Sequence, residues 1–408
     1  MPNFLDSDDT DAEWRARAAA VIPGGASTGS KRPEALYGVD AADAPTHYVS
    51  ASGCRVVTAG GVELVDCTMA LGAVALGYAD DAVTQAVADA AARGNVSGLS
   101  SVLEVEVAER LCEVIPCAER VRFLKSGAEG VNAAVRIART HTGRPLVLGC
   151  GYFGWLDWWS DAPGVTPGAR ADFRAVPFDD PDALEHAVRS AGDALAAVVL
   201  EPVIERLPSE EWVATARRLC DETGAVLVFD EMKTGFRLRT GGYQEFAGIT
   251  PDLAVFGKAL ANGYPLAAVV GRADVMEAAR VTWISSTLAG ETVGLAAAGA
   301  VLEWHARGEV CEALWEVGEE MKGAVERAVA ASGIGGVRVR GIPPMWLVDF
   351  DEEEHRTRFL ALAREGGVLF KRGAYNFASA AHDESAIARI ETAASDALVR
   401  LRDEVHAG

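Results

Sequence analysis

Short apolar runs that alternate with helical patterns constrain the fold of this chain more than any other feature of its sequence. The runs are rich in Val, Leu and Ala, and helical stretches lie at about residues 128–141 and 210–222. Alternation of this kind is typical of an α/β protein whose mostly parallel sheet is covered by helices. The expected strands are VRFLK (121–125), PLVLGC (145–150), AAVVLE (196–201), AVLVFD (225–230), LAVFG (253–257) and LAAVVG (266–271).

The last third of the chain has a different pattern. Apolar residues from Val310 to Val329 are spaced by three or four positions, which predicts one long helix. Two strand-like segments follow, VRVRG (337–341) and MWLVDF (345–350), and the stretch 384–404 is again helical. These elements predict a smaller domain of the α+β type.

The length of 408 residues is enough for two to four domains, and two fit the change of pattern best. We expect a large α/β domain at residues 55–300 and a small domain at 301–408. The N-terminal segment, residues 1–54, is expected to pack with the small domain.

The balance of charge argues against several classes of partner. The chain has 38 basic and 59 acidic residues, which gives a net charge of -21. Such a surface repels nucleic acid and anionic membranes. No apolar run is long enough to span a bilayer, and the acidic N-terminus does not resemble a secretory signal. We therefore expect a cytoplasmic protein.

The cysteines and histidines give no metal or disulfide pattern. The seven cysteines are scattered through apolar segments without a CxxC pair, which favours reduced thiols in the core. The seven histidines are dispersed too, and none pairs at the spacing of metal ligands. We expect no metal site.

Three sets of residues at strand ends carry the chemistry, because ligands of open α/β sheets bind beyond the carboxyl ends of the strands. The first set is Ser126, Gly127 and Ala128, which follow a strand and open a helix. A helix N-terminus with small residues is suited to a phosphate group. The alternative is an ordinary Ser-Gly turn that caps the helix.

The second candidate is Asp230, the last residue of the run AVLVFD. A carboxylate at the end of an apolar strand is costly to bury unless it meets a cation. One suitable cation is the protonated ring nitrogen of a bound cofactor. The alternatives are a helix cap and a salt bridge with Arg237.

The third candidate is Lys258, which comes directly after an apolar strand and a glycine. The chain has only six lysines among its 38 basic residues. Partial desolvation lowers the pKa of a lysine and favours imine formation with a carbonyl. The alternative is an ordinary surface lysine.

A phosphate turn, a strand-end aspartate and a buried lysine, in this order, are the three anchors of pyridoxal 5′-phosphate (PLP). With these residues the chain resembles the class III aminotransferases of fold type I, in the branch similar to glutamate-1-semialdehyde aminomutase. The resemblance covers about residues 15–400, and DE-x-x-TGFR followed by PDL-x-x-x-GK is highly specific. It is carried by IPGGASTGSKRP (22–33), ALGAVALGY (70–78), FLKSGAEGVNAAVRIAR (123–139), GYFGWLDWW (151–159), LVFDEMKTGFRL (227–238), PDLAVFGKALANGYPLAAVVGR (251–272) and STLAGET (286–292).

The resemblance implies a role for each matching residue of the cofactor site. Lys258 is the implied Schiff-base lysine, and Asp230 is implied to keep the pyridine nitrogen protonated. Tyr152 and Met232 are implied to lie on opposite faces of the ring. The remaining implied contacts are to the phosphate and come from Ser126, Gly127, Ala128 and Thr287. Thr287 is implied to reach the phosphate of a neighbouring subunit. A homodimer with active sites at the subunit interface is therefore expected.

The sequence departs from the family pattern at four positions. Phe153 stands where relatives commonly have His, and Ala128 replaces a usual Thr. Lys31 lies where the aminomutase has an Arg for the substrate carboxylate, and Leu71 replaces its Trp. These departures weaken the expectation of the aminomutase substrate.

The substrate side of the site is less determined. Lys31 and Arg32 are candidates for a carboxylate or phosphate group, or they form a solvated turn, and Arg372 is a candidate for a carboxylate. Trp155, with Trp158 and Trp159, either covers the cofactor or fills the core.

The expected activity is transamination between an amino donor and a keto or aldehyde acceptor, both small molecules. The alternative is an aminomutase, which uses the same residues. A racemase and a non-catalytic PLP-binding protein are weaker alternatives, and the presence of Lys258 and Asp230 argues against the last.

Overall fold

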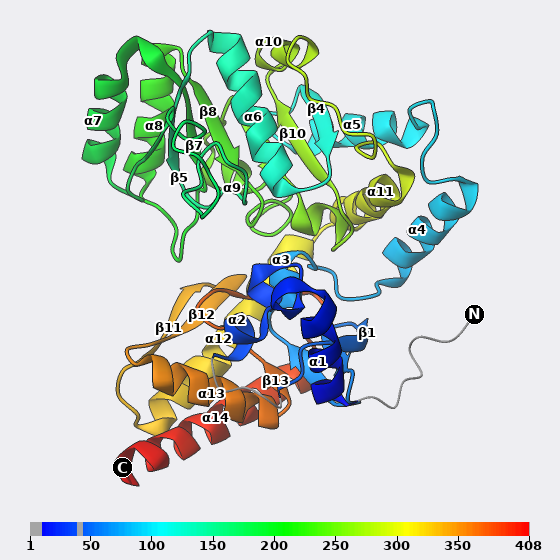
Figure 1. Cartoon of the computed structure of the whole chain (residues 1–408), viewed down its shortest axis with the longest axis vertical. Helices are drawn as coiled ribbons and strands as arrows, with labels where there is room; N and C mark the ends of the chain where they lie inside the picture. Colours follow the sequence, from blue (N-terminus) through cyan, green and yellow to red (C-terminus); the bar gives the residue numbers. More distant parts are fainter. Residues whose placement is uncertain (1–9, 39–43, 408) are drawn as a thin grey trace. The chain divides into compact units, whose positions relative to one another are not determined.

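The computed structural model describes residues 10–38 and 44–407, which divide into two compact units (Figure 1). The large unit is Asp81–Cys311. The small unit consists of the described parts of Met1–Asp80 and Glu312–Gly408.

The large unit is built on a seven-stranded sheet in the order β4-β10-β9-β8-β7-β5-β6. Strand β10 runs antiparallel to β4 and β9, and the pairs from β9 through β6 are parallel. Every residue of β7, β8, β9 and β10 is buried, as expected for strands covered on both faces. The strands are β4 (Arg120–Leu124), β5 (Leu146–Cys150), β6 (Phe173–Ala175), β7 (Leu195–Leu200), β8 (Val226–Asp230), β9 (Leu253–Phe256) and β10 (Ala267–Gly271).

Helices cover this sheet, and α6 packs across five of its strands (Figure 1). The helix α6 places Val131, Val135 and Ile137 in the core, while α8 packs on β7 and β8. The helices of the large unit are α4 (Asp81–Arg93), α5 (Val102–Val114), α6 (Gly127–Thr142), α7 (Pro181–Ala191), α8 (Glu210–Thr223), α9 (Tyr243–Ala247), α10 (Ala273–Met276) and α11 (Thr292–Ala306), with 3-10 turns η3 (Gly192–Ala194), η4 (Lys258–Ala261) and η5 (Glu277–Arg280).

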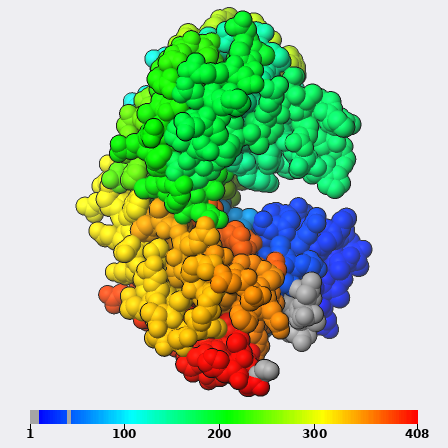
Figure 2. All heavy atoms as spheres, turned by 90° about the vertical axis from the view of Figure 1, so that its left-hand side faces the viewer, coloured from blue at the N-terminus to red at the C-terminus, as the bar shows by residue number. Residues whose placement is uncertain are grey.

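The small unit contains two sheets, with the strand orders β1-β2-β3-β13 and β11-β12-β14. Its helix α14 packs along α13, and both can be followed at the surface in Figure 2 (red and orange). The strands are β1 (Tyr48–Ser52), β2 (Arg55–Thr58), β3 (Glu63–Asp66), β11 (Val337–Ile342), β12 (Met345–Phe350), β13 (Val368–Leu369) and β14 (Asn376–Phe377). The helices are α1 (Asp11–Val21), α2 (Pro33–Tyr37), α3 (Met69–Gly72), α13 (Glu353–Glu365) and α14 (Glu384–Ala407), with 3-10 turns η1 (Pro23–Gly25) and η2 (Gly29–Lys31); α12 (Val310–Ser332) begins in the large unit and continues into the small one.

The α/β class, the mostly parallel sheet and the separate smaller sheets agree with the fold expected from the sequence. The boundaries of the two units differ from the expected ones. Residues 55–80 were assigned to the large domain, but β2 and β3 pair with β1, and β3 also pairs in parallel with β13. These pairings join the segment to the C-terminal part of the chain, so the large unit begins at Asp81 and ends at Cys311.

The segment that contains Leu71 has an unusual backbone. Met69, Ala70 and Leu71 have φ angles of 41°, 49° and 61°, and Gly72 continues the left-handed run at 80°. A left-handed conformation is costly for residues with a Cβ atom. The turn therefore persists only because its surroundings hold it, with Met69 fully buried.

All seven cysteines are free, and six of them have a raised pKa because burial disfavours the thiolate. No helix in the described part of the chain is both long and apolar enough to cross a membrane. The cytoplasmic location stays a prediction from the sequence.

Candidate active site

Asp230 and Lys258 follow two neighbouring strands of the large sheet. Asp230 is the last residue of β8, and Lys258 begins η4, directly after Gly257 at the end of β9. Because β8 and β9 are parallel, with Asp230 opposite Val255, both side chains start from the same edge of the sheet. This edge is where an open α/β sheet binds its ligands.

Asp230 is a buried carboxylate with a strongly perturbed pKa. Burial and the nearby charge of Glu201 raise its pKa to about 7, while the Met232 N–H, Lys258 and Lys233 oppose the increase. Its Oδ1 accepts a hydrogen bond from the backbone N–H of Met232 at 3.0 Å. A cationic ligand placed here would stabilise the ionised carboxylate.

Lys258 is shifted in the opposite direction. Burial and the charge of Lys233 lower its pKa to about 8, although Asp230 and Glu201 act against the decrease. Its backbone is left-handed, with φ of 49°. A lysine with a lowered pKa holds more of its amine in the neutral form, which is the form that attacks a carbonyl.

The predicted phosphate turn forms the start of α6. Ser126 is the N-cap, and its Oγ accepts a hydrogen bond from the Glu129 N–H at 3.3 Å. The Glu129 carboxylate in turn accepts from the Ser126 N–H at 2.9 Å, which completes a capping box. The helix-cap alternative is thus present, and it leaves the helix N-terminus suited to an anion.

Met232 packs directly over this turn. A Cβ atom at Gly127 would lie 2.7 Å from Met232 Cε, so the Met232 side chain would have to shift if this position carried a side chain. Ala128 is similarly close to the next loop, because a Cβ atom at Gly154 would lie 2.3 Å from Ala128 Cβ. The turn, Met232 and the start of the aromatic loop therefore belong to one site.

The aromatic loop after β5, residues 151–159, divides its side chains between core and surface. Tyr152 and Trp155 are 67% and 74% exposed, while Trp158 is buried. Trp159 is partly buried, contacts Tyr152 edge-to-face and donates its Nε1–H to the Gly154 carbonyl at 3.0 Å. Two of the three tryptophans thus fill the core. Trp155 is the one available to a ligand, and its substrate role stays a prediction.

The surroundings of Phe153 explain why a phenylalanine stands where relatives commonly have a histidine. It is fully buried and packs on Trp158, Trp159 and Phe173. A histidine there would need a polar partner in this apolar cluster. The aromatic core beneath the loop therefore suits Phe153.

Glu201 and Lys233 are site residues that the sequence reasoning missed. Glu201 follows β7 directly, and Lys233 lies in the turn after β8. Their side chains form an ion pair in which only 9% of the Glu201 and 14% of the Lys233 side chain is exposed. The available signal was the same as for Asp230, namely a carboxylate at the end of an apolar run.

Thr287 does not lie in the same site as Asp230 and Lys258 within this chain. It is exposed in the loop between η5 and α11 and lines a separate pocket of about 460 Å³. The loop of residues 94–101 forms the other side of this pocket.

The three basic substrate candidates belong to the small unit. Lys31 and Arg32 are exposed at the end of η2 and the start of α2. Arg372 forms an ion pair with Glu353 and donates to the Glu34 carbonyl at 3.3 Å. A carboxylate of the chain itself therefore holds Arg372, and the substrate role of all three stays a prediction.

Comparisons with known proteins identify the family. The family model for class III aminotransferases matches residues 37–151 and 171–379. The 3-aminobutyryl-CoA aminotransferase of Cloacimonas acidaminovorans is 31% identical over 83% of this chain and 82% of that protein. The glutamate-1-semialdehyde 2,1-aminomutase of Roseiflexus castenholzii is 31% identical over 96% and 98%.

Solved structures agree with this result. The FumI protein of Sphingopyxis sp. MTA144, solved in its PLP internal aldimine form, matches with a TM-score of 0.92 and 27% identity over 97% of both chains. A transaminase solved with PLP bound matches with a TM-score of 0.88 and 27% identity. The chain belongs to the class III aminotransferase family. It is a PLP-dependent enzyme, as expected from the sequence.

The residues present fit this cofactor. Lys258 offers a desolvated amine for the aldehyde, and Asp230 offers a buried carboxylate whose pKa is raised by burial and by Glu201, so that a protonated ring nitrogen beside it would stabilise its ionised form. The α6 N-terminus offers N–H groups to a phosphate, and Gly127 has no side chain at the point where Met232 packs on the turn.

Proposed function

We propose that the chain transfers an amino group from a small amino donor to a keto or aldehyde acceptor, with Lys258 and Asp230 as its catalytic residues. The observation that carries the proposal is the desolvated Asp230–Lys258 pair at the ends of β8 and β9. Bound PLP supplies an electron-withdrawing ring that stabilises negative charge at the substrate Cα.

The residues of the chain divide the remaining work. Lys258 Nζ would hold the cofactor through its aldehyde, and once released as a free amine it would take and return a proton at the substrate Cα. Asp230 keeps the ring nitrogen protonated. Ser126, Gly127 and Ala128 bind the phosphate, while Tyr152 and Met232 hold the two faces of the ring. Lys31, Arg32, Trp155 and Arg372 remain the substrate candidates.

An aminomutase is the second candidate, because relatives that are 31–34% identical are named glutamate-1-semialdehyde 2,1-aminomutase. A screen of amino donors and acceptors on the purified protein separates the two. A transaminase releases a keto product from the donor and needs a separate acceptor. An aminomutase gives an isomer of its substrate and accumulates no keto product.

We also propose a homodimer whose active sites lie at the subunit interface. Large apolar side chains are exposed on two neighbouring loops of the large unit, including Leu99 at 84% and Trp283 at 83%. Val96, Val102 and Leu288 extend this exposed set. Exposed apolar surface of this kind is typical of an interaction site.

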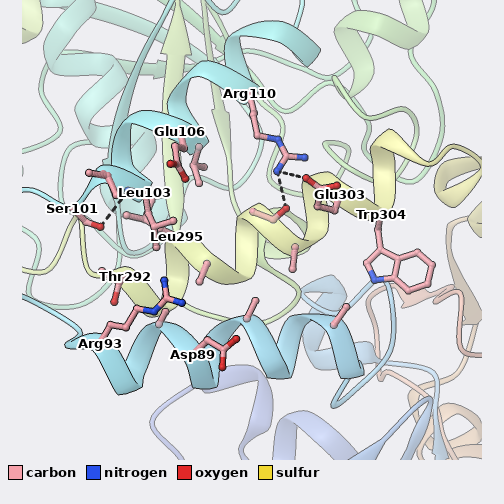
Figure 3. Close-up of a pocket in the computed structure, with 18 of the residues that line it drawn as sticks. Asp89, Arg93, Ser101, Leu103, Glu106, Arg110, Thr292, Leu295, Glu303 and Trp304 are labelled. Atoms are coloured by element: carbon pink, nitrogen blue, oxygen red, sulfur yellow. Dashed lines mark hydrogen bonds and ion pairs between the residues drawn. The ribbon is translucent and has the colours of Figure 1, made fainter.

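A groove beside these loops supports the same proposal (Figure 3). It has a volume of about 720 Å³ and lies between α4, α5 and α11. Small side chains such as Ala86, Ala90 and Ala300 line it, and at one end Arg110 pairs with Glu303 at 2.9 Å. Its lining shares Arg93 with the Thr287 pocket, so one partner surface could cover both.

A further inference from the structure

The ion pair of Glu201 and Lys233 joins three segments of the candidate site. Glu201 follows β7, and Lys233 lies three positions after Asp230. The second carboxylate oxygen of Glu201, Oε2, accepts a hydrogen bond from the Tyr152 N–H at 3.0 Å. The pair therefore connects the β7 end, the turn after β8 and the start of the aromatic loop.

The backbone around Tyr152 is shaped for this contact. Gly151 has φ of 138°, and a Cβ atom there would lie 2.4 Å from Glu201 Cβ. The chain can pass Glu201 this closely only with glycine at this position. Glu201 thus fixes where the aromatic loop leaves the sheet.

The pair also adds two charges beside the catalytic residues. The charged groups that act on Lys258 are Lys233, Asp230, Glu201 and Arg237. Those that act on Asp230 are Glu201, Lys258 and Lys233, together with the Met232 N–H. Glu201 and Lys233 appear in both sets with opposite signs, so each limits the effect of the other.

We propose that the Glu201–Lys233 pair is a positioning element of the active site, which holds the Tyr152 backbone in place and balances the charge around Asp230 and Lys258. Neither residue is assigned a step in catalysis. The inference rests on the proposed function of this site, in which Tyr152 covers the cofactor ring and Lys258 carries the amine.

The charge balance is tested through the ionisation of Lys258 in the full-length chain after bound PLP has been removed. Competitive acetylation with acetic anhydride at a series of pH values, read by peptide mass spectrometry, gives the pKa of the Lys258 amine. The variants are Lys233→Met, Glu201→Gln and the double variant. Lys322→Met is the control, because it removes a lysine that pairs with Glu326 in the small unit.

The expected shifts have a fixed order. Lys233→Met removes a neighbouring cation and leaves the Glu201 carboxylate without its partner, so the pKa of Lys258 rises by about one unit. Glu201→Gln removes an anion, so the pKa of Lys258 falls. The double variant lies between the two and leaves no lone buried charge, which keeps the test available if Lys233→Met does not fold.

The positioning role is tested by hydrogen exchange at the Tyr152 amide. Glu201→Leu removes the acceptor and should speed exchange of this amide at least tenfold, as expected when a hydrogen bond worth about 1.4 kcal/mol is lost. Glu201→Gln keeps an acceptor oxygen and should restore slow exchange. A role in packing alone would not distinguish the two variants.

Two results would overturn the inference. One is a Lys258 pKa that is the same in the wild type and in Glu201→Gln, so that the second substitution has no shift to reverse. The other is unchanged exchange of the Tyr152 amide in Glu201→Leu. Both measurements need no bound cofactor, so a chain that shows the expected shifts but does not bind PLP would refute the proposed function and not the role of the pair.

Discussion

The charges of Asp230 and Lys258 stabilise each other. At each of the two residues, the charge of the other acts against the pKa shift that burial causes. The Lys258 ammonium lowers the pKa of Asp230, and the Asp230 carboxylate raises the pKa of Lys258. Burial outweighs both effects, which leaves pKa values of about 7 and about 8. Lys258 can therefore change its protonation near neutral pH, where a general acid or base is most effective, and Asp230 is held ionised by a cation beside it.

Borohydride reduction of the purified holoenzyme is expected to fix the cofactor to Lys258. The reason is that its lowered pKa leaves a neutral amine available for imine formation. Peptide mapping by mass spectrometry identifies the modified lysine. Lys233 provides the internal comparison, because it is a second lysine beside Asp230. A label on Lys233 or on any other lysine would refute the assignment of Lys258.

Asp230→Asn is expected to keep the fold and to lower turnover by several orders of magnitude. The amide cannot hold the ring nitrogen in its protonated form, and each 1.36 kcal/mol lost from the transition state is about a tenfold decrease in rate. Steady-state kinetics measure the effect. Asp182→Asn, at an exposed position of α7, is the control. Turnover of Asp230→Asn within about threefold of the wild type would contradict the role, judged on the same scale.

The stability of the cofactor-free chain should depend on Asp230 in a defined pH range. Its folded pKa of about 7 lies above the ordinary carboxyl value of 3.8, so the folded state holds a proton that the unfolded state loses. The contribution of Asp230 to the free energy of unfolding is then lost as the pH rises from about 4 to about 7. Asp230→Asn should gain stability relative to the wild type over this range, as measured by urea unfolding.

His305 gives the control of opposite sign for this experiment. Burial lowers its pKa from 6.5 to about 4, and its Nδ1 lies 3.0 Å from Thr240 Oγ1. Its contribution to stability is present above pH 6.5 and is lost as the pH falls towards 4. His305→Gln should therefore gain relative stability at low pH.

Equal dependence of the free energy of unfolding on pH in Asp230→Asn and in the wild type would show that Asp230 is not buried as described.

Thr287 is expected to act across a dimer interface. A mixed dimer in which one chain carries Lys258→Ala and the other Thr287→Ala tests this. If Thr287 reaches the phosphate of the partner, both defects fall on one site, and the other site is intact and active. If it acts within its own chain, each site carries one defect. A fully active monomer, seen by sedimentation, would also contradict this role.

The sequence predicted the site residues that come at the end of an apolar run. Asp230 and Lys258 each end an apolar run, so local pattern alone places them at the edge of a sheet. Glu201 ends such a run too, but its partner Lys233 is distant along the chain. Only the pairing of β7 with β8 brings the two together, and a strand order is not written in local pattern.

The parts of the fold that were not predicted depend on long-range pairing. The strand at Val368–Leu369 is short, yet it pairs with β3 and moves residues 55–80 into the small unit. The antiparallel direction of β10 is set by its pairing with β4 and β9 and is not visible in its apolar composition. The burial of the three tryptophans of the aromatic loop could not be predicted either. The loop is neither helix nor strand, so its sequence has no periodicity that indicates which side chains point into the core.

The seven free cysteines bear on how this enzyme can be handled. An aldehyde cofactor reacts with thiolates, and burial keeps the thiols of six cysteines protonated. The chain thus offers its cofactor few competing nucleophiles. The same property leaves the native thiols poor targets for maleimides. A single cysteine introduced at an exposed site outside the proposed interface, such as Asp182 on α7, is then labelled selectively, which allows the distance between two subunits to be followed by fluorescence while the native cysteines stay in place.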